Sequence, residues 1–330
     1  MNKISFWFNN ARPISLPQSM LPGLTALAIS YGAASYSIIA AIACLIGVAF
    51  AHLGMNLLDD WFDYYSGSGE ARQQVSSEGF RGRMVKYPYL TSGQATPRQL
   101  LVAVCVFLAI AALMGGIVLW IRGWKIALWA LAALVIGVSY SGGPLKLAYR
   151  GLGELVIFVM FGPLMMTGVA YAITGTVSSQ IIWLSVAVGL LVTNIVYSHS
   201  VLDSIPDAKM GKKTMAHLMG GFKGQIFLSA LLNTLPFILV IVAVILGELH
   251  PAFLSVLLVF PLAIWLVKSL TDFVYQRNEK IEIHWWMGPM GDFDKYRAAG
   301  VDWFLLRWLT ARNIVQFFCL IVCIVNFIVA

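Results

Sequence analysis

Charged residues are scarce in this sequence. Only 11% of its 330 residues are Asp, Glu, Lys or Arg, about half the share that soluble globular proteins carry. The four cysteines, Cys44, Cys105, Cys319 and Cys323, all fall within apolar stretches and form no CxxC pair, so neither a disulfide framework nor a zinc site is indicated. The sequence also lacks a P-loop, a GxGxxG fingerprint, an HExxH motif and a GxSxG motif, which argues against the nucleotide-binding and hydrolase sites they mark.

Long apolar runs take the place of charge. Hydrophobic residues make up 59% of the chain, and runs of about 18 or more recur from end to end, which is the length that crosses a bilayer. We therefore expect an all-α, polytopic membrane protein with nine transmembrane helices. The predicted spans are 17–33, 36–58, 99–121, 125–142, 152–174, 181–202, 224–247, 251–270 and 311–329.

The positive charges orient these spans. With the N-terminus in the cytoplasm, 20 of the 22 Lys and Arg residues fall on cytoplasmic segments, and only Arg122 and Lys125 lie outside. Cytoplasmic loops of membrane proteins carry such an excess, so we predict a cytoplasmic N-terminus and a C-terminus on the far side. This bias explains the net charge of +7 without a nucleic-acid partner. Residues 1–18 show no signal-peptide pattern and are expected to stay on the protein.

A cluster of carboxylates ends the second predicted span. In Asn56-Leu-Leu-Asp59-Asp60-Trp-Phe-Asp63, the residues Asn56, Asp60 and Asp63 are spaced i, i+4, i+7 and share one helix face. Asp59 and Asp63 define a second possible face. Like charges repel at a membrane edge, and a divalent cation with oxygen ligands would offset that repulsion. The alternative is a solvated helix end just outside the bilayer.

A second acidic cluster ends the sixth predicted span and also faces the cytoplasm. Asp203 and Asp207 are four residues apart, on one face if the helix continues, although Pro206 predicts a kink or an end there. Two carboxylate groups facing one another across a cavity would bind a diphosphate through Mg²⁺, which takes hard oxygen ligands and reaches phosphate oxygens.

Basic residues near the clusters would neutralise the remaining phosphate charge. The candidates in cytoplasmic loops are Arg83, Lys86, Lys146, Arg150, Lys209, Lys212 and Lys213. The topology bias alone explains most of them, but Lys146 stands out because it lies in the tight turn that follows Tyr140. His199, one turn before Asp203, is either a packing residue or part of an acceptor pocket. The aromatic stretch 283–297 lies in the headgroup region or caps a cavity.

The two clusters together resemble the UbiA superfamily of intramembrane prenyltransferases. Asn56, Asp60 and Asp63 resemble its N-x-x-x-D-x-x-D signature, and Asp203 with Asp207 begins a stretch similar to its D-x-x-x-D-x-x-x-G-x-x-T, with Gly211 and Thr214 in place. The likeness runs from about Arg12 to the last span. It implies one integral-membrane prenyltransferase domain over residues 1–330, with an acidic motif in each half, roughly 1–122 and 123–330.

Within the superfamily the middle of the chain looks most like the 1,4-dihydroxy-2-naphthoate prenyltransferases of menaquinone synthesis. The stretches that carry this likeness are 140–144, 151–154, 161–163, 189–191, 211–214 and 310–312. The sequence departs from that branch where an Asn-Asn-x-Arg-Asp run is expected, because His199, Ser200 and Leu202 hold the Asn, Asn and Arg positions. An expected Arg before Ser92 is replaced by Tyr87-Pro88, and a further acid is missing unless Glu70 serves.

The resemblance implies Mg²⁺-dependent transfer of a polyprenyl group from a polyprenyl diphosphate to an aromatic acceptor. Asn56, Asp60, Asp63, Asp203 and Asp207 would hold the metal. Substrate-binding candidates are Lys146, Arg83, Lys86, Lys212, Tyr140 and His199. The expected location is the bacterial cytoplasmic (inner) membrane, with the active site facing the cytoplasm and no obligate protein partner. The alternatives are another acceptor, such as 4-hydroxybenzoate, a haem or a glycerol phosphate lipid, and a cation-coupled transporter.

Overall fold

The computed structural model describes residues 2–65, 87–209, 211–277 and 281–329. These residues form helices and connections, with one isolated bridge between Arg150 and Lys213 and no strand among them. The predicted all-α class is therefore confirmed. The chain divides into two compact units, which are described separately. Unit 1 comprises Met1–Leu147 and Leu164–Val177, and unit 2 comprises Ala148–Pro163 and Ser178–Ala330.

Seven helices in the described part of the chain are long and apolar enough to cross a membrane, so the chain is an integral membrane protein. They are α3 (Ile38–Tyr65), α6 (Pro97–Arg122), α8 to α9 (Gly153–Thr174), α10 (Ser179–Leu202), α13 (Phe222–Ile245), η4 to α14 (Pro251–Val274) and α16 (Asp302–Val329). The predicted spans 17–33 and 125–142 correspond to shorter helices, α2 (Pro17–Ser30) and α7 (Ile126–Ser141).

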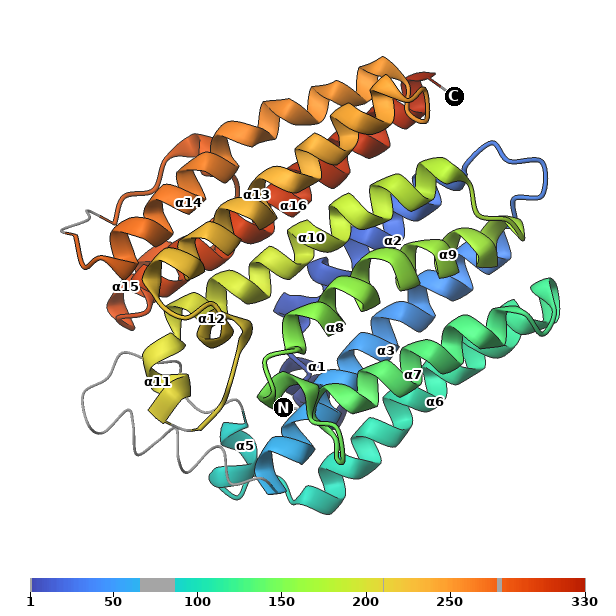
Figure 1. Ribbon diagram of the computed structural model, residues 1–330. Helices are drawn as coiled ribbons and strands as arrows, with labels where there is room; N and C mark the ends of the chain where they lie inside the picture. The colour runs from blue at the N-terminus through green and yellow to red at the C-terminus, as the bar shows by residue number, and fades with distance from the viewer. Residues whose placement is uncertain (1, 66–86, 210, 278–280, 330) are drawn as a thin grey trace. The chain divides into compact units, whose positions relative to one another are not determined.

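Unit 1 is built on the packing of α3 against α6, which lie side by side with α7 (Figure 1). Gly54 lets the two helices approach, because a Cβ there would lie 2.9 Å from the Leu108 side chain. Leu53 and Leu57 of α3 pack with Leu100 and Val104 of α6 in the core. This contact fixes the helix that carries the first acidic cluster.

The amino-terminal helix α1 and the short helix α5 also contribute to this core. Phe6 and Trp7 of α1 (Lys3–Asn10) pack against it, and η1 (Pro13–Ser15) follows directly. The short helix α5 (Pro88–Thr91) adds the buried residues Tyr89 and Leu90. The amino-terminal segment is therefore part of the folded unit.

In unit 1, α9 (Met165–Thr174) is tied to its neighbours by two side chains. Arg122 at the end of α6 donates to the carbonyl oxygens of Ala172, at 2.8 Å, and Ile173. These carbonyls belong to the last turn of α9, where a cation is favourable. Trp129 of α7 stacks on Tyr171, with ring centroids 4.7 Å apart.

Unit 2 is centred on α10, most of whose apolar length is buried. α8 (Gly153–Val159) continues into the π-helical turn η3 (Met160–Leu164), where Pro163 lacks an N–H and the wider turn accommodates it. A Cβ at Gly162 would lie 2.6 Å from the Gly189 Cα, so two glycines let this segment and α10 pack backbone against backbone. Asn194 of α10 also pairs with Asn233 of α13. Each side-chain amide donates to the oxygen of the other, at 2.9 and 3.1 Å.

The helix α16 begins nine residues before the predicted start at 311. The predicted span leaves Arg307 outside the membrane, whereas this arginine lies within α16 and its side chain is 2% exposed. Its guanidinium donates to the carbonyl oxygens of Trp303 and Ser269, at 2.6 and 3.1 Å, and lies over the Phe273 ring. Backbone acceptors and an aromatic face thus enclose a charge inside the helix bundle.

The aromatic stretch after α14 folds onto α16. It contains η5 (Trp285–Met287) and α15 (Phe293–Ala298). Asn313 of α16 donates to the Met287 carbonyl oxygen at 2.8 Å, and Met287 is fully buried. Trp285 is 93% exposed. The stretch is therefore anchored at Met287 and presents an indole at the surface of unit 2.

Candidate functional site

The first acidic cluster lies near the end of α3, which runs without a break through all four polar residues. Asp60 is fully buried and Asp63 is 4% exposed, while Asn56 and Asp59 are half-buried. Burial of a carboxylate requires a counter-charge or hydrogen-bond donors. Asp60 and Asp63 are therefore not part of a solvated helix end.

A counter-charge comes from the amino-terminal segment. Arg12 Nη2 lies 3.2 Å from Asp60 Oδ1 and 3.4 Å from Asp59 Oδ2, and it donates to the Asn56 carbonyl oxygen at 2.6 Å. Burial lowers the pKa of the Arg12 guanidinium, but the carboxylates of Asp60 and Asp59 outweigh it and raise that pKa overall. Arg12 stays charged. Sequence spacing gives no sign of this contact, because 44 residues separate Arg12 from Asn56.

A tyrosine supplies a hydrogen bond to the same carboxylate. Tyr89 OH donates to Asp60 Oδ2 at 2.9 Å. Burial, followed by the nearby Asp60 charge, raises the pKa of the Tyr89 phenol well above its usual range, so it remains a donor. Phe6 and Trp7 pack edge-on around its ring, with centroids 6.1 and 5.9 Å away. Both oxygens of Asp60 therefore meet a residue from outside α3.

Asp63 and Asp59 have different surroundings. Tyr87 OH donates to the main-chain carbonyl oxygen of Asp63 at 3.2 Å. The Ser141 hydroxyl at the end of α7 donates to Asp59 Oδ1. The predicted substrate-binding residue Tyr140 immediately precedes Ser141 and is half-buried. Asp59 is thus tied to the start of the turn that contains the other candidate of this region, Lys146.

The Asn56 amide is oriented by the amino-terminal segment. Its Nδ2 donates to the Ala11 carbonyl oxygen at 3.0 Å and to Ser15 Oγ at 2.9 Å. Its Oδ1 accepts no hydrogen bond from any residue that the structure describes. Outer contacts of this kind fix the direction of a ligating group, and here they leave the carbonyl oxygen for another ligand.

These donors suit a hard divalent cation. Amide and carboxylate oxygens are the ligands that Mg²⁺ and Ca²⁺ take, and Mg²⁺ keeps several waters or phosphate oxygens in its shell. Across residues 2–65, 87–209, 211–277 and 281–329, no three His, Cys, Asp or Glu side chains converge as a complete ligand set. The residues fit a cation that is completed by a phosphate ligand.

The second acidic cluster lies where α10 ends. Asp203 is fully buried and Asp207 is 2% exposed. The break falls at Asp203, and α11 (Ser204–Lys209) runs through Pro206. The predicted break at Pro206 is therefore misplaced by three residues. Pro206 lies in the first turn of α11, where a backbone N–H has no partner within the helix, so a proline fits there without breaking it. The Asp207 N–H donates to the Asp203 carbonyl oxygen at 2.9 Å, which keeps the two aspartates one turn apart.

The residues after Asp207 turn the chain back. Gly211 has a left-handed backbone (φ 69°), and the Lys212 N–H donates to the Asp207 carbonyl oxygen at 2.9 Å, as in a glycine-terminated helix end. Lys212 Nζ lies 3.7 Å from Asp207 Oδ2. Thr214 then begins α12 (Met215–Leu218) in a capping box with His217. The glycine and threonine of the motif thus shape the loop that places Lys212 beside Asp207.

Two further residues support this cluster. His199 Nε2 lies 2.9 Å from Asp203 Oδ2, and its ring packs edge-on against Phe304. Glu154, at the start of α8, is 3% exposed and accepts from Ser200 Oγ at 2.7 Å. It also accepts from the Met215 N–H at 3.4 Å, so it joins α10 to the end of the Lys212 loop. Residues 151–154 carry part of the family resemblance, but the sequence did not predict this role for Glu154.

The remaining predicted site residues are less involved. Lys146 is exposed, with a left-handed backbone (φ 44°), and its N–H donates to the Gly142 carbonyl oxygen at 2.9 Å. Arg83, Lys86 and Glu70 lie outside the described residues. The structure thus brings Asn56, Asp60 and Asp63 together in unit 1, and it brings His199, Asp203, Asp207 and Lys212 together in unit 2.

Three relatives of the chain carry names of prenyl-transferring enzymes. The chain is 28% identical to the 1,4-dihydroxy-2-naphthoate octaprenyltransferase of Bacillus subtilis over 79% of its length and 80% of that protein. The protein of the same name from Mycobacterium tuberculosis is 28% identical, over 70% of this chain and 76% of its own length. The 2-carboxy-1,4-naphthoquinone phytyltransferase of Synechocystis is 23% identical, over 62% of this chain and 68% of its own.

A solved structure shares the fold. A UbiA homolog from Archaeoglobus fulgidus bound to GPP and Mg²⁺ superposes with a TM-score of 0.59 at 19% identity, over 94% of this chain and 99% of that one. The sequence also matches the UbiA prenyltransferase family over residues 19–290. The predicted resemblance and the prediction of a prenyl-transferring enzyme are confirmed. The chain belongs to the UbiA prenyltransferase family.

Proposed function

We propose that the chain transfers a polyprenyl group from a polyprenyl diphosphate to 1,4-dihydroxy-2-naphthoate in menaquinone synthesis. The observation that carries the proposal is the enclosure of Asp60 and Asp203 within two hydrogen-bonded acidic clusters. The names of the bacterial relatives support the acceptor, and the archaeal homolog bound to GPP and Mg²⁺ supports the donor.

The proposal includes the predicted architecture. The chain is one catalytic domain of nine spans, in which α2 and α7 join the seven long helices, and its N-terminus lies in the cytoplasm of a bacterial cell. The Lys and Arg distribution supports this orientation. A reporter enzyme that is active only on the non-cytoplasmic side of the membrane should be active when it is fused to the C-terminus. A C-terminal reporter that proves to lie in the cytoplasm would contradict the orientation.

Asn56, Asp60 and Asp63 in unit 1, and Asp203 and Asp207 in unit 2, would hold Mg²⁺ for one diphosphate. When bound, Mg²⁺ neutralises charge that develops on the departing diphosphate. Arg12 and Lys212 already lie beside these carboxylates, and their charges would balance the diphosphate together with Lys146 and, outside the described residues, Arg83 and Lys86. His199 and Tyr140 would line the acceptor pocket.

The reaction breaks the allylic C–O bond of the donor, and the diphosphate leaves with the electron pair. The ring carbon that bears the carboxylate attacks the allylic carbon and forms a C–C bond. The bond from that ring carbon to the carboxylate then breaks, CO₂ leaves, and the electron pair of the broken bond restores the aromatic ring. The mechanism requires that the helices of the protein keep water from the reacting carbon, because water would otherwise trap it. The prenyl tail enters from the lipid, which explains why the site belongs to a membrane protein.

An acceptor panel tests the proposal. Purified full-length protein with a labelled prenyl diphosphate and Mg²⁺ should release diphosphate and CO₂ with 1,4-dihydroxy-2-naphthoate. Product with 4-hydroxybenzoate, a haem or a glycerol phosphate lipid instead would replace the acceptor and keep the reaction class. His199 stands where the naphthoate branch has an asparagine, so His199→Asn should preserve turnover of 1,4-dihydroxy-2-naphthoate. His199→Phe removes the polar contact with Asp203 and should lower that turnover. No product with any acceptor would refute the proposed function.

A further inference from the structure

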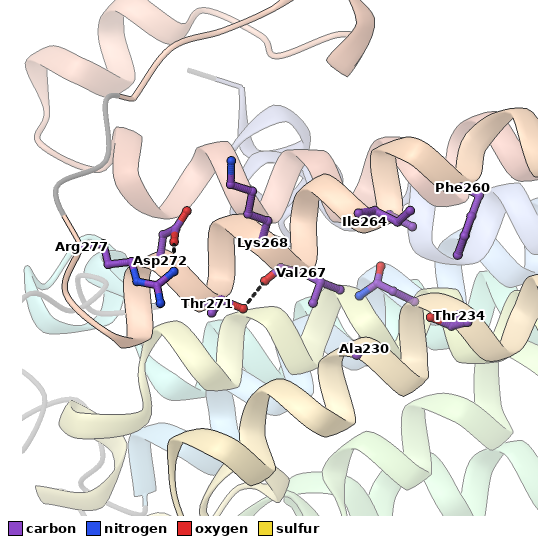
Figure 2. A pocket seen from close by; sticks show the side chains of 11 residues that line it. Ala230, Thr234, Phe260, Ile264, Val267, Lys268, Thr271, Asp272 and Arg277 are labelled. Carbon is purple, nitrogen blue, oxygen red and sulfur yellow. Dashed lines mark hydrogen bonds and ion pairs between the residues drawn. The ribbon is translucent and has the colours of Figure 1, made fainter.

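A groove in unit 2 is lined by no residue of either acidic cluster and has the features of a lipid site. It lies between α13 and α14, and its volume is about 370 Å³, within the ~300–1,000 Å³ of typical ligand pockets. Figure 2 shows Phe260 at one end and the pair Asp272 and Arg277 at the other, with Ile264, Val267 and Lys268 between them. Asn233, Thr234 and Thr271 line it as well, so the groove has an apolar wall, a few neutral polar side chains and charged residues at one end.

The apolar part suits a hydrocarbon chain. Ala230 of α13 and Ala263 of α14 are small, so the two helices leave a channel, and Phe260 closes its far end against Phe237, with ring centroids 5.1 Å apart. Ile264 is 55% exposed. An exposed aliphatic wall on a membrane-spanning helix faces lipid, so an acyl chain could enter from the side.

The charged end suits an anionic headgroup. Arg277 Nη1 lies 3.0 Å from Asp272 Oδ1, so that pair is nearly neutral. Lys268, one turn before Asp272, is exposed and makes no ion pair or hydrogen bond with any described residue. The groove therefore has a net charge of +1 at the end of α14, where the bias of Lys and Arg places the cytoplasmic surface. Basic pockets between membrane helices on this side bind phospholipid headgroups.

We propose that this groove binds an anionic glycerophospholipid, with one acyl chain between α13 and α14 and its phosphate at Lys268 and Arg277. A neutral zwitterionic lipid fits the channel but gains less from Lys268. The proposal is independent of the prenyl-transfer reaction, because it involves none of the residues of either acidic cluster.

The test is native mass spectrometry of the full-length protein in neutral detergent, titrated with phosphatidylglycerol or with phosphatidylcholine of the same chains and without prenyl substrates. Phosphatidylglycerol should bind more tightly. Lys268→Gln should weaken it roughly fivefold, the effect of about one cation near a lipid headgroup. Asp272→Asn should tighten it, because the carboxylate repels the phosphate. Ala230→Phe should fill the channel and abolish binding.

Matched controls separate the site from general effects. Lys223→Gln, the control for Lys268→Gln, removes an exposed lysine of α13. Leu231→Phe, the control for Ala230→Phe, enlarges an exposed residue of the same helix. Neither residue lines the groove. Both variants should bind lipid like the unaltered protein. Equal loss in Lys268→Gln and Lys223→Gln would overturn the proposal. Displacement of the lipid by inorganic phosphate alone would also overturn it, because the groove would then bind a free anion. A dimer that Ala230→Phe dissociates would overturn it too, because a second copy of the chain would then occupy the groove.

Discussion

Asp60 is the residue on which the first cluster depends. It is fully enclosed, and its two oxygens meet Arg12 and Tyr89. Asp59 lies one position earlier, is partly exposed and is tied to Ser141 and Arg12. A buried acid whose neighbours are fixed is pre-organised for a ligand, whereas a partly solvated one can relax.

Replacing Asp60 should therefore cost more activity than replacing Asp59. We expect Asp60→Asn to lower kcat by roughly 10²-fold or more, the effect of removing one fixed electrostatic group at a reacting centre. Asp59→Asn should lower it less. Asp294→Asn, at a fully exposed acid of α15, is the control and should leave prenyl transfer unchanged. Equal losses at positions 59 and 60 would contradict the assignment of the working helix face.

The ion pair between Arg12 and Asp60 predicts a coupling in stability. Arg12→Gln leaves Asp60 buried without this counter-charge, and the loss should be about 1–3 kcal/mol, less than for a fully buried pair because the Arg12 side chain is 29% exposed. The double variant Arg12→Gln/Asp60→Asn should be more stable than the sum of the single losses predicts. Unfolding in detergent without metal measures all three variants, and additive losses would mean that the two charges do not interact.

At the scale of elements, close helix packing in unit 2 rests on two glycines. A Cβ at Gly189 would lie 2.9 Å from the Gly162 Cα, and backbone cannot move aside as a side chain can. Gly189→Ala should therefore destabilise the protein by ~1–3 kcal/mol through overpacking. Gly116→Ala, on α6 with open space around the added methyl, should be neutral or stabilising, because alanine favours helix. The two melting temperatures compare them, and similar values would exclude the overpacking explanation.

Most elements were predictable from hydropathy, because a membrane span must be long and apolar whatever it packs against. The predictions failed where a tertiary contact satisfied a polar group, or where a helix position needed no N–H. Arg307 lies inside α16 because carbonyl oxygens and Phe273 surround it, and α11 passes through Pro206 because its first turn needs no N–H there. The candidate site was also predictable only in part. Local spacing indicates Asp60 and Asp207, whereas Arg12 and Tyr89 reach Asp60 from distant parts of the chain.

At the scale of the whole molecule, each unit carries one acidic cluster with its own basic residue. Arg12 belongs to unit 1 and Lys212 to unit 2. Each cluster on its own is partly neutralised by its basic residue. A diphosphate with Mg²⁺ is proposed to engage both clusters, so binding should stabilise both units together.

Ligand-induced stabilisation tests this directly. Mg²⁺ with a non-hydrolysable prenyl diphosphate analogue at 100 times its Kd should raise the free energy of unfolding by about 2.7 kcal/mol, and removal of the metal with EDTA should abolish the gain. Asp60→Asn and Asp207→Asn should each remove most of it, since each alters one of the two units. Asp294→Asn should keep it. A full gain in the Asp207→Asn variant would restrict the binding site to the first cluster.

Arg12 reaches the first cluster from the first dozen residues, and Phe6 and Trp7 pack around Tyr89 beside it, so the amino-terminal segment belongs to the proposed catalytic centre. Proteolytic removal of this segment during extraction, or a tag that disturbs its packing, would separate the guanidinium from Asp60 without touching any of the seven long helices. Such a preparation would keep its circular dichroism spectrum and elution volume while losing turnover. The mass of the intact chain is therefore the better criterion for an active sample, and affinity tags belong at the carboxyl end.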